Sequence, residues 1–361
     1  MSDDIARLRL IRSDNIGPVT YRQLLRRFGS ATVALQALPD LVRRGGGSAR
    51  IAPAADVEAE IAAVARFGGR FVFIGDDDYP FLLAQTETAP PALAVKGDTA
   101  LLDRPAVAMV GARNSSAAAV RFARELATAL AEAELVVVSG LARGIDAAAH
   151  WGALSGGTIG VVAGGLDIVY PPENAELQNR IGAEGLVVAE SAFGIQPQAR
   201  HFPRRNRIIA GLCAGTVVVE GALRSGSLIT ARIAAEAGRE VMAVPGSPLD
   251  PRTQGCNQLI REGATLIQSA ADIVEALGTV SGDVGGRLLS PDRAWEPGPV
   301  AVEADDATRD EIARLLSPVP VAIDELVRQT GCASATVAGA LLDLELAGGI
   351  VRHAGGRVAL A

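Results

Sequence analysis

The stretch that decides the fold is 106–162, which reads AVAMV-GARNSS-AAAVRFARELATALAEA-ELVVVSG-LARG-IDAAAHWGAL-SGG-TIGVV. Three short apolar runs rich in Val and Ile alternate with two longer stretches typical of helices. The apolar runs are Ala106–Val110, Leu135–Val138 and Thr158–Val162, and the helical stretches are Ala117–Ala133 and Ile145–Leu154. Strands that are apolar on both faces and alternate with helices indicate a parallel sheet covered on both sides.

The same alternation continues toward the C-terminus. Further apolar runs are Leu186–Ala189, Thr216–Val219 and Val241–Val244, with a helical stretch at Leu228–Ala237. This order predicts an α/β protein with an extended, Rossmann-like, doubly wound parallel sheet spanning residues 67–278.

Smaller modules flank the predicted sheet. Residues 1–66 predict short helices, with Thr20 as an N-cap and Gly29 just past a helix end, around a turn that resembles a helix-hairpin-helix. Residues 279–302 predict a linker, beginning in the Gly- and Pro-rich stretch Gly278–Pro299. Helices at Ala307–Leu316, Ile323–Gln329 and Ala335–Leu346 and a hairpin around 354–356 predict a winged helix over 303–361.

Composition narrows the functional classes. The chain has 361 residues, a net charge of −7 and three cysteines that are far apart, with no Cys-x-x-Cys pair. No disulfide framework or metal site is therefore expected, and a reducing cytoplasm is the expected location. The first residues are acidic and no apolar run is long enough to span a membrane.

The loops after the predicted strands are the candidate binding loops, because ligands of doubly wound sheets bind at the carboxyl ends of strands. Two of them place an arginine among small residues near a helix N-terminus: Gly111 and Arg113 in the first, and Ser139, Gly140, Arg143 and Gly144 in the second. Ser225, Gly226 and Ser227 precede a third helix. Free amides and arginine favour an anion such as phosphate.

A cationic segment strengthens the prediction of an anion site. No carboxylate occurs from Ser191 to Val219, whereas Arg200, Arg204, Arg205 and Arg207 lie there, with Asn206 among them. An arginine cluster beside glycine-rich turns suits an extended polyanion, although a solvated helix face would show the same composition. We expect this segment to form a loop.

The sequence gives little support for catalysis. It lacks Gly-x-Gly-x-x-Gly and the phosphate-binding loop of nucleotide hydrolases, so no cofactor is expected. It also lacks a nucleophile elbow and an acidic metal cluster. We interpret His150 as a packing residue, and Asp146, in the first turn of its helix, as a cap of that helix's own amides or a partner of a loop arginine.

Taken together, the loops resemble the DprA/Smf family of DNA-processing proteins of bacterial natural transformation (competence). The matching segments are Tyr79-Pro80, Pro90-Pro91, Lys96-Gly97, Val107–Arg113, Ser139–Asp146, Ala149-His150, Tyr170-Pro171, Asn174, Glu190-Ser191, Phe202–Gly211, Val219-Glu220, Ser225–Ala231, Ala243–Gly246 and Gly255–Gly263.

This resemblance implies that residues 1–66 form a sterile-alpha-motif-like domain. It also implies a non-enzymatic, sequence-independent single-stranded DNA-binding protein and a homodimer. It further implies a recombination mediator that protects incoming DNA and loads RecA, helping RecA past single-strand-binding protein. By motif, Arg113 and Arg143 are the expected phosphate contacts, with Arg204, Arg205 and Arg207 continuing the pocket. Because only 4% of the residues are aromatic, with Phe202 alone in the cationic cluster, backbone charge should supply most of the affinity.

Two other functions stay open at this point. The combination Gly215-Thr216 with Glu220 faintly resembles nucleoside-monophosphate phosphoribohydrolases, which would make the chain a nucleotide-processing enzyme. A winged-helix transcription regulator would need a basic recognition helix. The predicted helix Ala335–Leu346 contains no Lys or Arg, and residues 300–361 carry nine acids against five arginines, so we expect this module to contact protein rather than DNA.

Overall fold

The structure is a computed structural model that describes residues 3–281, 300–353 and 355–361. It divides into two compact units. The first combines both ends of the chain, residues 1–59 and 295–361, and the second comprises residues 60–294.

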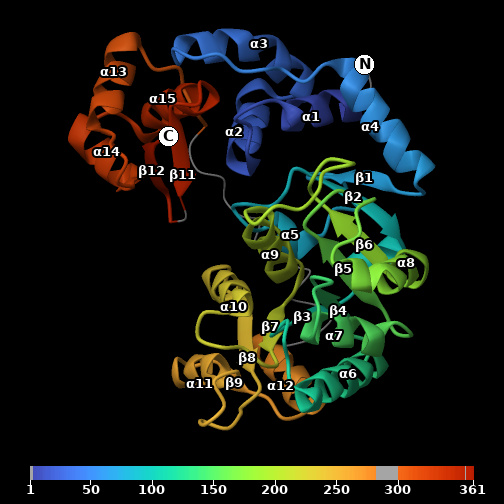
Figure 1. Ribbon diagram of the computed structural model, residues 1–361. Coiled ribbons are helices and arrows are strands. Elements are labelled where there is room, and N and C mark those ends of the chain that lie inside the picture. Colours follow the sequence, from blue (N-terminus) through green and yellow to red (C-terminus); the bar gives the residue numbers. More distant parts are fainter. Residues whose placement is uncertain (1–2, 282–299, 354) are drawn as a thin grey trace. The chain divides into compact units, whose positions relative to one another are not determined.

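The second unit contains a nine-stranded sheet in the order β1-β2-β6-β5-β4-β3-β7-β8-β9 (Figure 1). Its strands are β1 (Arg70–Phe73), β2 (Ala92–Gly97), β3 (Ala106–Val110), β4 (Val136–Ser139), β5 (Thr158–Val162), β6 (Leu186–Ala189), β7 (Gly215–Val218), β8 (Glu240–Ala243) and β9 (Thr265–Leu266). From β6 to β9 every neighbouring pair is parallel, which confirms the predicted Rossmann-like sheet.

One edge of the sheet differs from the prediction. Strands β1 and β2 pair with each other antiparallel, and β2 pairs antiparallel with β6. The sheet is therefore mixed. Only the short helix α5 (Phe81–Ala84) lies between β1 and β2, and the chain returns along the neighbouring strand in the opposite direction.

Helices cover both faces of this sheet, as expected for strands that are buried on both sides. One face carries α9 (His201–Leu212), which packs on β3, β4 and β5 between α5 (Phe81–Ala84) and α10 (Gly226–Glu236). The other carries α6 (Ala117–Glu132), α7 (Ile145–Ala153) and α12 (Ala270–Ser281). The remaining helical elements are α4 (Ala54–Arg66), η1 (Thr99–Asp103), η2 (Pro172–Asn174), α8 (Ala175–Glu184) and α11 (Gln254–Arg261).

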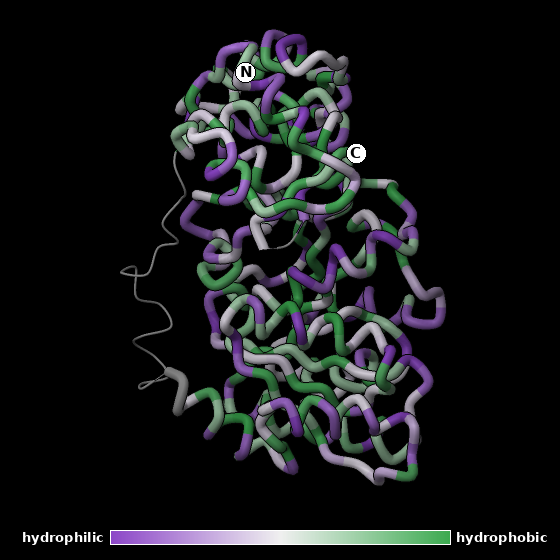
Figure 2. Tube along the Cα trace, turned by 90° about the vertical axis from the view of Figure 1, so that its left-hand side faces the viewer, coloured by the Kyte–Doolittle hydropathy of each residue, from purple (hydrophilic) through white to green (hydrophobic). Residues whose placement is uncertain are grey.

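The core consists of one apolar cluster on each side of the central strands. Alternate residues of β3 divide between them: Ala108 and Val110 face the α9 side, and Val107 and Met109 face the α6 side. In Figure 2, hydrophobic colouring is frequent on the inner segments of the trace and hydrophilic colouring on its outer turns.

The first unit begins with three helices, α1 (Asp3–Arg12), α2 (Pro18–Phe28) and α3 (Ala31–Arg44). Thr20 is not the N-cap of α2, because the helix already begins at Pro18, with Gly17 in the cap position. Proline fits the first helical position, because its missing N–H is not needed there. The helix therefore begins earlier in the sequence than predicted. Gly29 ends α2 with a φ of 77°, as predicted.

The C-terminal part of this unit is the predicted winged helix. It contains α13 (Asp306–Leu315), β10 (Val321–Ala322), α14 (Ile323–Thr330), α15 (Ser334–Leu346), β11 (Ile350–His353) and β12 (Arg357–Leu360), with sheet order β10-β12-β11. Of the predicted linker, residues 279–281 belong to helix α12, and residues 282–299 lie outside the described residues.

Candidate nucleic-acid interface

The candidate site lies where the strand order of the sheet reverses. Strand β3 is paired with β4 on one side and with β7 on the other, so the chain winds away from β3 in both directions. At such a point the loops after neighbouring strands diverge and leave a crevice at their carboxyl ends, which is the usual ligand site of this fold.

A pocket of about 400 Å³ occupies this crevice. The loops after β3, β4 and β7 and the helices α9 and α10 contribute its walls. The lining residues are Val110, Gly111, Ala112, Arg113, Ala142, Asp146, Arg205, Asn206, Ile209, Ser225, Gly226, Ser227 and Thr230. Segments that are distant in the sequence therefore converge on one site.

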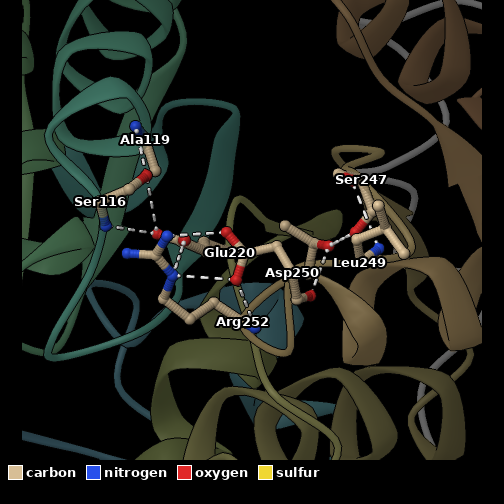
Figure 3. Close-up of polar contacts among 8 residues, drawn as sticks. Ser116, Ala119, Glu220, Ser247, Leu249, Asp250 and Arg252 are labelled. Atoms are coloured by element: carbon tan, nitrogen blue, oxygen red, sulfur yellow. Dashed lines mark hydrogen bonds and ion pairs between the residues drawn. The ribbon is translucent and has the colours of Figure 1, made fainter.

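A buried carboxylate holds the Arg113 loop in place. Glu220, which is buried after β7, accepts hydrogen bonds from the backbone N–H of Ser116 at 2.8 Å and from its hydroxyl at 3.4 Å. Figure 3 shows Glu220 between Ser116 and Arg252, whose Nε lies 3.4 Å from the Glu220 carboxylate. Ser116 in turn caps α6 by accepting from the N–H of Ala119.

Gly144 allows the two arginine loops to approach each other closely. Its φ is 75°, and a Cβ at this position would lie 2.3 Å from the carbonyl oxygen of Ala112. A side chain there would be strained and would push the loops apart. Gly144 therefore supports the site through its backbone and is not among the lining residues.

Arg205 and Asp146 form the charged floor of the pocket. The Asp146 carboxylate accepts from the N–H groups of Gly140 at 3.1 Å and Ala142 at 3.4 Å. Burial raises the pKa of Asp146, while the positive charge of Arg205 opposes that rise. Burial also lowers the pKa of Arg205 to about 10, and Asp146 opposes this shift in the same way. Each charge offsets part of the free-energy cost of burying the other in its ionised form.

The cationic segment is a helix, α9, and not the loop that the sequence predicted. Pro203 stands in the first turn, where a proline interrupts no helical hydrogen bond. The helix separates the arginines. The guanidinium of Arg205 points inward and donates to the carbonyl oxygens of Gly140 and Val161. Arg204 stays exposed.

Glu190 partly neutralises the other two arginines of α9. Its carboxylate accepts from Arg204 at 3.1 Å and also from Arg207. The other terminal nitrogen of the Arg207 guanidinium donates to the carbonyl oxygen of Thr88. Arg207 is therefore tied to the body of the protein. Asn206 faces the pocket, and its amide lies 3.5 Å from the carbonyl oxygen of Gly226.

The N-terminus of α10 forms one wall of the pocket. Ser225 precedes the helix in an extended conformation and does not cap it with its side chain. Its hydroxyl instead lies 2.6 Å from that of Ser227. The first backbone N–H groups of a helix and its positive end favour a negative group beside them.

Six predicted residues lie outside the pocket lining, namely Ser139, Gly140, Arg143, Gly144, Arg204 and Arg207. Ser139 is buried, and its hydroxyl donates to the carbonyl oxygen of Met109 at 2.6 Å, so it connects β4 to β3. Arg143 is exposed, and its guanidinium lies 3.6 Å from the Glu173 carboxylate. Both side chains of this ion pair are well solvated, and such pairs exchange partners at little cost in free energy.

An aromatic pair borders the pocket beside Arg113. The guanidinium carbon of Arg113 lies 5.1 Å from the ring centroid of Phe202, and the Phe202 and Tyr170 rings lie 5.5 Å apart. Tyr170 is 47% exposed. Sequence reasoning missed Tyr170 as a site residue, because it follows β5 and is distant from Phe202 along the chain. Its position in a strand–helix loop was the available signal.

His150 is a buried packing residue, as the sequence predicted. Its Nδ1 lies 2.7 Å from the hydroxyl of Thr158, which donates its own proton to the carbonyl oxygen of Val137. Nδ1 must therefore carry the proton of the neutral ring. Burial, reinforced by the positive charge of Arg205, lowers the pKa of His150 to about 3.

Three models of known protein families match successive parts of this chain. The DprA-like N-terminal HHH domain matches residues 1–63, DNA recombination-mediator protein A matches residues 70–278, and the DprA winged helix domain matches residues 296–356. The chain belongs to the DprA/Smf family of DNA-processing proteins.

Relatives in this family are similar over long stretches. DNA processing protein DprA of Streptococcus pneumoniae is 50% identical over 201 residues, which are 55% of this chain and 71% of that protein. Protein Smf of Escherichia coli is 36% identical over 321 residues, which are 85% of this chain and 82% of that protein.

Solved structures of the family share the fold. The crystal structure of the Streptococcus pneumoniae protein has a TM-score of 0.58 at 45% identity and covers 62% of this chain and 77% of its own. The Helicobacter pylori protein, which was described for its single-stranded DNA binding mode, has a TM-score of 0.54 at 28% identity and covers 58% and 96%.

Two negative findings concern the described residues alone. None of their helices has both the length and the apolar character needed to cross a membrane. They also contain no group of three or more His, Cys, Asp or Glu side chains arranged to hold a metal ion.

Proposed function

We propose that this protein binds single-stranded DNA without sequence preference through the pocket at the carboxyl ends of β3, β4 and β7. The observation that carries the proposal is the pocket lining itself. It combines Arg113 with the N-terminus of α10 and with Arg205 beneath, so most of its recognition groups suit a phosphate. The single-stranded DNA binding described for the Helicobacter pylori relative supports the same assignment.

Arg143 extends the proposed binding path along the rim. Its ion pair with Glu173 is solvated, and a DNA phosphate can replace the carboxylate as its partner. Contacts made mainly to the sugar–phosphate backbone carry no sequence information. They would hold the strand while leaving most base edges free for pairing.

This mode of binding fits a recombination mediator, as the family match describes. We propose that a homodimer of this protein protects incoming single strands in the cytoplasm during natural transformation. It then loads RecA on them in the presence of single-strand-binding protein. A strand held by its backbone is both shielded from nucleases and accessible to a recombinase that must read the bases.

The decisive experiment measures binding of oligo-dT, a mixed single strand and its duplex by the wild type and by Arg143→Glu and Arg113→Glu proteins. The wild type should bind both single strands similarly and prefer them to the duplex. Each substitution should weaken binding at least tenfold, whereas Arg121→Glu, an exposed position on α6, should change it less than threefold. A folded Arg143→Glu Arg113→Glu protein that binds oligo-dT like the wild type would overturn the proposal.

The mediator role needs a second assay. RecA filament formation on single strands precoated with single-strand-binding protein should accelerate with the wild type and not with the Arg143→Glu Arg113→Glu protein. If the wild type binds DNA but does not accelerate RecA filament formation, the loading activity is refuted and only the DNA-binding function stands.

A further inference from the structure

A second set of contacts, distinct from the pocket, lies inside the first unit. Helix α15 of the winged helix packs against α2 and α3 of the N-terminal helices. In winged-helix proteins that read DNA, the equivalent recognition helix is the element that enters the major groove. Here part of its surface is already occupied by another segment of the same chain.

The close approach of α3 and α15 depends on glycines. A Cβ at Gly45 would lie 2.1 Å from the carbonyl oxygen of Asp343, and one at Gly47 would lie 2.3 Å from that of Ala347. No larger residue fits either position unless the backbones separate. This fit is typical of a specific packed contact.

Charge is complementary across this contact. Residues 1–50 contain nine arginines and four aspartates, whereas residues 300–361 carry nine acids against five arginines. Arg44 of the N-terminal helices pairs with Glu303 and lies 3.7 Å from the buried carboxylate of Asp343. Arg27 lies 3.8 Å from Glu303. The acidic module thus supplies carboxylates to arginines of the basic one.

The contact also reaches the turn between α1 and α2. The side-chain amide of Asn15 donates to the carbonyl oxygen of Leu346 at the C-terminal end of α15, at 3.0 Å. A helix C-terminus carries partial negative charge on its free carbonyl groups. At this turn, too, the winged helix places negative groups against the N-terminal helices.

We propose that the winged helix is an intramolecular acidic cover over a second polyanion-binding surface, formed by Arg27, Arg44 and the Asn15 turn. The ligand of the uncovered surface is a nucleic-acid backbone, since its groups are arginine guanidinium groups and a turn between two helices. Glu303, Asp343 and the end of α15 occupy the positions that phosphates would take. Release of the cover would then add a second DNA contact to the protein.

The test uses the full chain with Arg113→Glu and Arg143→Glu, so that the pocket contributes little. Gly45→Leu is added to separate α15 from α3. Gly45 has a φ of −72°, so leucine strains no backbone, and no charge changes. Amide hydrogen exchange of α15 and α3 should rise, and single- and double-stranded DNA at low salt should bind at least tenfold tighter than in the background protein.

Three further variants make the result specific. Adding Arg27→Gln and Arg44→Gln should abolish the gain, whereas adding Arg43→Gln, an exposed neighbour of Arg44, should preserve most of it. Glu303→Gln, at a solvated position, should give a smaller gain without opening the contact, and it remains informative if Gly45→Leu does not fold.

Faster exchange with no gain in DNA binding would overturn the proposal, and so would exchange that Gly45→Leu leaves unchanged in a folded protein. A failure of the single-strand proposal is distinguishable, because it would already appear as strong binding by the Arg113→Glu Arg143→Glu background.

Discussion

Arg113 lies over the ring of Phe202, with 5.1 Å between its guanidinium carbon and the ring centroid. The contact places a guanidinium group and an aromatic ring side by side at the border of the pocket. Tyr170 extends the aromatic surface, with its ring centroid 5.5 Å from that of Phe202. One nucleotide could therefore meet charge through its phosphate and a ring through its base.

We expect Phe202→Leu and Tyr170→Ala each to weaken binding of oligo-dT, because stacking of a base on an aromatic ring contributes roughly 1–3 kcal/mol. Roughly 1.4 kcal/mol corresponds to a tenfold change in Kd. The salt dependence should stay unchanged, since no charge is lost. Tyr170→Phe keeps the ring and serves as the control. Full affinity in the Phe202→Leu Tyr170→Ala double variant would show that the bases do not stack there.

Glu190 offsets part of the positive charge that α9 presents. Glu190→Gln should raise single-strand affinity about two- to fivefold, because Arg204 and Arg207 lose their carboxylate partner. The plot of log K against log salt should also become steeper, by about 0.7 for each additional phosphate that the protein neutralises. Glu184→Gln, which breaks the solvated pair with Arg180 on α8, is the matched control. An unchanged slope would mean that these arginines do not reach the strand.

Arg205 should matter for stability as much as for binding. Arg205→Ala leaves the buried Asp146 without its compensating charge and the carbonyl oxygens of Gly140 and Val161 without a donor. We expect a loss of about 3–5 kcal/mol in the free energy of unfolding, measured in urea. Arg204→Ala, one residue earlier and exposed, should cost less than about 1 kcal/mol. Equal effects of the two would contradict the assigned orientations of these side chains.

The low pKa of His150 predicts that the folded protein loses stability in acid. Its pKa is about 3 in the folded protein, against 6.5 for an ordinary histidine. Between these values the unfolded chain binds more protons, so stability falls as the pH drops from 6.5 toward 3. The contribution of His150 reaches about 1.4 kcal/mol per pH unit. Asp146, whose pKa is raised, changes stability in the opposite sense, so a difference measurement is needed.

The His150→Leu protein provides that difference. Its free energy of unfolding should be lower near neutral pH, where the bond to Thr158 is lost, but should fall less steeply on acidification than that of the wild type. Parallel curves for the two proteins would show that His150 does not titrate in this way.

Most of the sheet could be predicted from the sequence, because strands buried on both faces leave continuous apolar runs. The strands from β3 to β8 follow this rule, and each was predicted to within one residue of its observed ends. The predicted apolar runs did not include strands β1 and β2. Polar residues at or near their ends, Arg70 in β1 and Lys96 in β2, shorten the apolar runs of these two strands.

The site was harder to predict in detail, because side-chain direction depends on packing. Four arginines of one segment look alike in the sequence. Arg205 turns inward because of the rotation of α9 about its axis as the helix packs on β4 and β5. The partner of Phe202 depends on tertiary structure in the same way, since the loop after β5 delivers Tyr170 from another part of the chain.

The pairing of β3 with β7 has a consequence for how the protein matures. Val107 aligns with Gly215, so this pairing joins two halves of the domain that are synthesised well apart in time. A nascent chain that has ordered only β3 to β6 possesses the Arg113 and Arg143 loops but lacks α9, Glu220 and the serines of α10. The proposed affinity for DNA should therefore arise late, as the last segments of the sheet assemble, and partly made chains would not compete for strands with finished ones.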